Sequence, residues 1–121
     1  MTDVEFEAVP EFPKELEKLS KKCKSLNGDF GNFKKVLTKT MPNHVSGTVR
    51  ISGLGENVKI PIYKVKHFRS IDFKGRGSRS GFRIIYAHIQ NSEKVIFIEI
   101  YNKNNKTNHD ERRIKKYFED I

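Results

Sequence analysis

The stretch of sequence that bears most on the fold reads Tyr63-Lys-Val-Lys-His-Phe-Arg-Ser-Ile-Asp-Phe-Lys-Gly-Arg-Gly-Ser-Arg-Ser-Gly-Phe-Arg83-Ile-Ile-Tyr86. Here a basic segment rich in Gly and Ser runs directly into the apolar strand pattern of residues 82–90. From position 64 to position 83, seven Lys and Arg residues stand against one acid, so this segment carries +6 of the whole-chain charge of +9. The bases are Lys64, Lys66, Arg69, Lys74, Arg76, Arg79 and Arg83, and the acid is Asp72. A local cationic field indicates an anionic partner, and phosphate is the leading candidate.

Length and composition predict a single domain with a modest core. A chain of 121 residues is expected to form one domain over positions 1–121. With 36% hydrophobic and 32% charged residues, we expect a thin core and a highly charged surface. The single cysteine, Cys23, excludes an intramolecular disulfide and a Cys-x-x-Cys zinc site. No apolar run reaches membrane-spanning length and no signal pattern opens the chain, so we expect a cytoplasmic protein with no membrane partner.

Upstream of the basic segment, the pattern predicts a strand followed by two helices. Val4, Phe6 and Ala8 alternate with acidic residues, which is the period of a half-buried strand. Apolar residues then recur at helical spacing over residues 12–26 and again over residues 30–41. Asn27-Gly28-Asp29 is predicted to be the turn between the two helices. The N-terminal third is therefore predicted to be a strand and an αα-hairpin.

Downstream, the pattern predicts strands and a last helix. Residues 42–57 give a weak signal, interpreted as a loop that holds at most a short strand near residues 48–51. Strands are predicted at 58–68, 82–90 and 94–101, and Asn108 followed by Glu111 resembles a capping box that starts the last helix. The predicted fold class is α+β, with a mostly antiparallel sheet of about four strands. We expect the helices to pack on one face of this sheet and the other face to stay partly open.

This order of elements resembles the RelE/ParE superfamily of toxins from bacterial and archaeal toxin–antitoxin pairs, in its RelE-like and HigB-like branches. Val4-Glu-Phe-Glu-Ala-Val-Pro-Glu-Phe-Pro-Lys-Glu-Leu-Glu-Lys-Leu19 looks like the first strand and helix of that family. Gly75-Arg-Gly-Ser-Arg-Ser-Gly-Phe-Arg83-Ile-Ile-Tyr86 looks like its glycine–aromatic–arginine strand with the preceding basic loop. Ile98-Glu-Ile-Tyr-Asn-Lys103-Asn-Asn-Lys106-Thr-Asn108 is similar to the end of its central strand. The resemblance spans nearly the whole chain and implies a RelE-like fold.

The resemblance also implies an activity and its residues. RelE-like members are endoribonucleases that cut messenger RNA, usually in the ribosomal decoding site, without a metal or a cofactor. On this resemblance Arg83 contacts the scissile phosphate, Lys66 and Arg69 match basic residues of the preceding strand, and Lys103 matches the basic residue after the central strand. Lys74 and Arg76 are the alternative to Lys66 and Arg69, because they lie nearer to Arg83 in sequence. Further RNA-binding candidates are Lys64, Lys74, Arg76, Arg79, Tyr86 and Lys106.

Proton transfer is the step for which the sequence leaves several candidates. RNA cleavage without a metal needs a base for the 2′-hydroxyl, cations for the phosphorane oxygens and an acid for the leaving 5′-oxygen. Some family members carry a catalytic tyrosine after the last basic residue, and residues 104–109 hold none. A lysine crowded by other cations has a lowered pKa and can act as a base, and His67 and His109 are the ordinary candidates.

Three functions compete at this point. The first is a ribosome-dependent endoribonuclease toxin, which the cations around Arg83 favour. The second is a ParE-like toxin that acts on a protein such as DNA gyrase, and the third is a module that binds RNA without cutting it. For the toxin, the expected partners are messenger RNA, the ribosome and a cognate antitoxin, because an open cationic face attracts an acidic or amphipathic segment.

Overall fold

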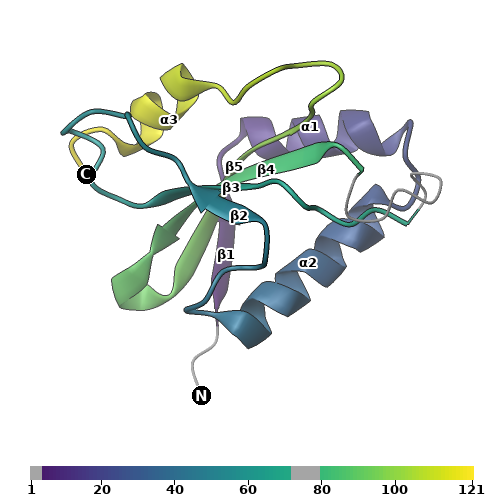
Figure 1. Ribbon diagram of the computed structural model, residues 1–121, viewed down its shortest axis with the longest axis horizontal. Helices are drawn as coiled ribbons and strands as arrows, with labels where there is room; N and C mark the ends of the chain where they lie inside the picture. The colour runs from purple at the N-terminus through teal and green to yellow at the C-terminus, as the bar shows by residue number, and fades with distance from the viewer. Residues whose placement is uncertain (1–3, 72–79) are drawn as a thin grey trace.

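The computed structural model of the chain describes residues 4–71 and 80–121, and Figure 1 shows their arrangement. The described elements are β1 (Glu5–Ala8), α1 (Glu11–Ser20), α2 (Leu26–Thr40), β2 (Thr48–Arg50), β3 (Ile62–Val65), β4 (Phe82–Ile89), the 3-10 turn η1 (Gln90–Ser92), β5 (Lys94–Asn102) and α3 (Glu111–Phe118). The five strands form one sheet in the order β1-β5-β4-β3-β2. β1 runs parallel to β5, and the other neighbours are antiparallel. The α+β class and the mostly antiparallel sheet are confirmed.

The expectation of about four strands is wrong by one, because β2 adds a fifth. β2 has only three residues, lies at the edge of the sheet and buries none of them. An edge strand without a buried face leaves no alternating apolar pattern in the sequence, so residues 48–50 gave only a weak signal. The predicted strand at 58–68 is shorter than expected: β3 covers Ile62–Val65, and Val58 forms an isolated bridge with Glu119 instead.

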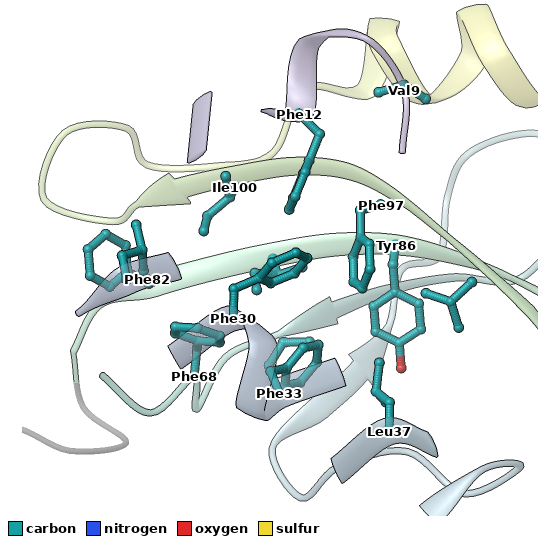
Figure 2. Close-up of a cluster of buried hydrophobic side chains, with 14 of the residues drawn as sticks. Val9, Phe12, Phe30, Phe33, Leu37, Phe68, Phe82, Tyr86, Phe97 and Ile100 are labelled. Atoms are coloured by element: carbon teal, nitrogen blue, oxygen red, sulfur yellow. The ribbon is translucent and has the colours of Figure 1, made fainter. Parts of the chain in front are cut away.

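The larger core lies between the sheet and the helices α1 and α2. Aromatic rings from three elements meet there, as Figure 2 shows: the ring centroid of Phe97 on β5 lies 4.7 Å from Phe30 and 5.3 Å from Phe12. Tyr86 enters the same cluster from β4 and is fully buried. Aromatic pairs at these separations stabilise a core beyond the area they bury.

The last helix lies on the opposite face of the sheet, so the prediction that all helices share one face is wrong. Ile114 and Phe118 of α3 belong to a second buried cluster with Ile85, Ala87 and Ile98. Successive residues of a strand point to opposite faces of the sheet. In β4, Tyr86 therefore packs in one core and Ile85 in the other. Because α3 has only eight residues, it covers only part of this face.

Two local predictions are corrected by side-chain hydrogen bonds. Asn27-Gly28-Asp29 lies inside the first turn of α2, and the connection between the helices falls at residues 21–25. The Asp29 carboxylate is buried and accepts hydrogen bonds from Ser25 Oγ at 2.7 Å and Ser70 Oγ at 2.8 Å, which fixes it within the helix. The cap of α3 is Asp110, whose side chain accepts from the Arg113 main-chain N–H at 3.1 Å, and not Asn108.

Candidate nucleic-acid interface

Two adjacent strands, β3 and β4, place cations on the sheet face that α3 only partly covers, and β5 places Glu99 and Tyr101 beside them. Lys64 of β3 lies opposite Ile85, and Ile85 lies opposite Glu99 of β5. In the next row along the sheet, Arg83 lies opposite Tyr101. Because directly paired residues present their side chains on the same face, these side chains share the face of α3. We call this surface, with Lys64, Lys66, Arg83, Glu99, Tyr101, Lys106 and His109, the cationic face.

Arg83 is held at the start of β4 by its neighbour strand. Its Nη1 donates a hydrogen bond to the main-chain oxygen of Lys66 at 2.8 Å and a longer one to the oxygen of Phe82 at 3.4 Å. Within residues 4–71 and 80–121, neither Nη2 nor Nε of Arg83 has a hydrogen-bond partner. A guanidinium that is oriented by one edge and free at the other can grip two oxygens of a phosphate.

Lys64 is a half-buried lysine of the cationic face. Its Nζ donates to Asn108 Oδ1 at 2.9 Å. Burial lowers the pKa of this ammonium, and the positive charges of Lys66 and Arg83 lower the pKa further. A lysine with a lowered pKa gives up its proton more readily than a free one, which suits proton transfer.

A buried carboxylate lies among these cations. Glu99 is 1% exposed; its Oε2 pairs with Lys106 Nζ, and its Oε1 accepts the main-chain N–H of Asp110 at 2.8 Å. The Lys106 ammonium also lies 5.6 Å from the centre of the Tyr101 ring. Glu99 therefore pairs with Lys106 and not with Arg83.

His109 lies on the connecting loop of residues 103–109, between β5 and α3. Burial is the largest cause that lowers the pKa of its imidazole, and the charge of Lys64 is the next. Its Nδ1 is buried and has no hydrogen-bond partner in the described part of the chain. Because the lowered pKa favours the neutral ring, His109 can accept a proton.

The fold therefore brings together many of the predicted residues. Lys64, Lys66, Arg83 and Lys106 share the cationic face, and Lys103 follows β5 at its edge, where its main-chain N–H bonds to the oxygen of Gly81 at 2.8 Å. Of Lys66 and Arg69, the pair that the structure describes, Lys66 is the one that lies beside Arg83. Three predicted residues, Lys74, Arg76 and Arg79, lie outside the described residues.

Two predicted residues lie away from the cationic face. Arg69 lines a groove along α2 together with His67, Phe33 and Val36. Tyr86 is fully buried under the other face of the sheet, where its hydroxyl bonds to His44 Nδ1. Strand alternation puts Tyr86 opposite in direction to Arg83, so its ring is closed to a nucleobase and the stacking role predicted for it is wrong.

Glu99 and Tyr101 of the cationic face, and Asn108, which bonds to Lys64, are residues that the sequence alone did not select for the site. Glu99 did stand out as the one charged residue in the apolar run 95–101. A lone acid there can signal a site, because a buried carboxylate needs partners. The contacts of Asn108 depend on how the connecting loop folds back, and no sequence pattern marks them.

The described residues include no cluster of three or more His, Cys, Asp or Glu side chains that could hold a metal ion. None of the described helices is long and apolar enough to cross a membrane.

Comparison of the sequence with protein-family models and with curated proteins finds no match. Among solved structures, the chain is similar to one described as an archaeal RelE–RelB complex from Pyrococcus horikoshii OT3. The TM-score is 0.56 at 15% sequence identity, and the alignment covers 85% of this chain and 97% of that one. The fold of the protein is therefore RelE-like.

Proposed function

We propose that the protein is the toxin of a type II toxin–antitoxin pair and a metal-independent endoribonuclease that cleaves messenger RNA on the ribosome. The observation that carries this proposal is the guanidinium of Arg83, which uses Nη1 for hydrogen bonds to the protein and leaves Nη2 and Nε without a partner among the described residues. It lies beside Lys64 and Lys66 on the part of a RelE-like sheet that α3 does not cover. A phosphate bound there would meet three cations at once.

The proposed chemistry uses these cations as preorganised charge. Arg83 and Lys66 stabilise the negative charge that develops on the phosphorane oxygens as the 2′-oxygen attacks phosphorus. Lys103 and Lys106 lie on the connecting loop after β5 and bind neighbouring phosphates. Removing a single donor aimed at such a charge typically slows the chemical step by about 10²- to 10³-fold.

A cognate antitoxin is the proposed protein partner. The solved structure with a similar fold is a complex of RelE with RelB, which supports the proposal of such a partner here. A segment that covers Arg83 must offer acidic side chains, because the cationic face carries four Lys and Arg side chains against one buried carboxylate. A pull-down from the native host that recovers no small protein encoded nearby would count strongly against this partner.

Inducible expression in a bacterium, with primer-extension mapping of abundant messenger RNAs, tests the function. The wild type is compared with Arg83→Ala and with a matched control, Lys39→Ala, which removes an exposed cation from α2 on the other side of the sheet. Growth arrest with new in-frame cuts from the wild type and the control, but not from Arg83→Ala, supports the proposal. Arrest without cuts points to a ParE-like action on gyrase. A folded wild type that binds RNA and neither arrests growth nor cuts RNA is a binding module.

A further inference from the structure

Glu99 fastens the connecting loop at two points. Its Oε2 holds Lys106 within the loop, and its Oε1 holds the main-chain N–H of Asp110, directly after the loop. Both contacts start from a carboxylate that is almost fully buried in β5. A third contact, from Lys64 Nζ to Asn108 Oδ1, ties the same loop to β3. Loops positioned by a rigid sheet in this way commonly carry functional residues.

The residue that these contacts position is His109. It lies between two fastened residues, Asn108 and Asp110, and its own main-chain N–H donates to Asn108 Oδ1 at 2.9 Å. The charged groups that act on its ring come from every surrounding element: Lys64 from β3, Glu99 from β5, Lys106 from the connecting loop and Glu111 from α3. The ring lies close enough to Lys64 for the charges of the two to interact, and Lys64 in turn interacts with Arg83.

We propose that His109 accepts the proton of the 2′-hydroxyl when RNA is cleaved, and that Glu99 is the positioning residue that holds His109 beside Lys64. This inference rests on the ribonuclease function proposed above. Its geometric basis is that Lys64 Nζ bonds at 2.9 Å to Asn108, the residue directly before His109. The Nδ1 of His109 is buried, so Nε2, which has no hydrogen-bond partner among the described residues, is the nitrogen that takes up the proton. His67, the other candidate, lies in the groove along α2 and not on the cationic face.

The 2′-hydroxyl gives its proton to the His109 imidazole while the 2′-oxygen forms a bond to phosphorus. The bond from phosphorus to the 5′-oxygen breaks, and its electron pair stays on that oxygen. The Lys64 ammonium gives a proton to the 5′-oxygen. The products are a 2′,3′-cyclic phosphate and a free 5′-hydroxyl, nothing is oxidised or reduced, and water returns the proton from His109 to Lys64.

Single-turnover cleavage of messenger RNA on purified ribosomes, measured across pH, tests the inference. The variants are His109→Gln, Glu99→Gln and the matched control His67→Gln, with melting curves to show that each is folded. A wild type that uses His109 as its base loses activity as the pH falls through the pKa of that ring. We expect His109→Gln to lose about 100-fold or more in rate and to lose this acid limb, while ribosome-bound messenger RNA is held as tightly as before.

Glu99→Gln separates positioning from simple structural support. The carboxylate of Glu99 raises the pKa of His109, so its removal should move the midpoint of the acid limb to lower pH as well as slow the reaction. An unmoved midpoint would overturn the role of Glu99. Folded His109→Gln that cleaves like the wild type at every pH would overturn the inference alone, since the nuclease would still stand. A wild type that cleaves nothing would overturn the proposed function together with the inference.

Discussion

Arg83 Nη1 lies 2.8 Å from the main-chain oxygen of Lys66, and this hydrogen bond joins two residues that are 17 positions apart in the chain. The antiparallel register of β3 and β4, with Val65 opposite Ile84, makes the two neighbours. The pairing of the two strands therefore brings the acceptor, which lies one residue past β3, to the guanidinium. A phosphate site built on paired strands is held more firmly than one built on a loop.

Loss of a cation from the cationic face should appear in the salt dependence of RNA binding. We expect Lys66→Ala to weaken binding of a single-stranded RNA oligonucleotide and to reduce the slope of log K against log salt by about 0.7, the value for one phosphate contact. Fluorescence anisotropy at several salt concentrations measures this slope. Lys39→Ala on α2 is the control and should leave the slope unchanged; an equal reduction in both variants would mean that binding depends on net charge and not on the cationic face.

Tyr86 should matter for stability and not for RNA. Tyr86→Phe removes only the hydroxyl that bonds to His44 Nδ1. We expect the free energy of unfolding to fall by about 1 kcal/mol, the usual contribution of one hydrogen bond, while growth arrest in the expression assay persists. Urea denaturation and the expression assay give the two readouts. Loss of RNA binding in a stable Tyr86→Phe protein would show that Tyr86 contributes to RNA binding.

Stability should fall in mildly acidic solution because of His44. Burial lowers the pKa of this ring below 6.5, with a smaller lowering by His88 and an opposing effect of Glu93. Below pH 6.5 the unfolded chain then binds a proton that the folded chain does not, so the stabilisation present above that pH is lost as the pH falls through the folded pKa. The pKa of His109 is also lowered, so this residue adds to the loss of stability at acidic pH.

The slope is at most about 1.4 kcal/mol per pH unit for each such histidine. Urea denaturation at neutral pH and at about one unit below the unperturbed histidine pKa measures the loss. His44→Gln removes one titrating group, and the pH-dependent loss should shrink in this variant. An identical loss in the wild type and in His44→Gln would show that other groups cause it.

The ion pair that joins α3 to α1 should contribute more to stability than its exposed neighbour. Arg113 binds Glu15 through two hydrogen bonds of 2.9 and 2.8 Å, and the Arg113 side chain is 12% exposed. A double-mutant cycle of Arg113→Met and Glu15→Gln should give a coupling energy of about 1–3 kcal/mol. The matched cycle uses Lys116 and Glu11, which lie 3.7 Å apart with Lys116 65% exposed, and should give about 0.5 kcal/mol or less. Equal coupling in the two cycles would contradict the importance assigned to burial.

Strong local patterns account for the elements that the sequence predicted well. β4 and β5 are predicted to within a residue because each is a mostly apolar run that ends in polar residues. The connection between α1 and α2 was misplaced because Gly28 resembles a turn residue. One of the contacts that hold Asp29 inside α2 comes from Ser70, 41 positions away, and no local pattern shows it.

By itself, the sequence determined that positive charge is concentrated around a strand arginine, because charge is a sum over residues and needs no coordinates. It also determined the order of the strands and helices other than β2, since hydrophobic period depends on near neighbours alone. Only the tertiary structure decided which cationic side chains lie beside one another. Strand pairing puts Lys64 and Lys66 beside Arg83, and the chain after β3 carries Arg69 to the groove along α2. Two hydrogen-bonding oxygens of the buried Glu99 fold the connecting loop back onto the sheet and bring His109 there, because a buried carboxylate is stable only when its partners come to it.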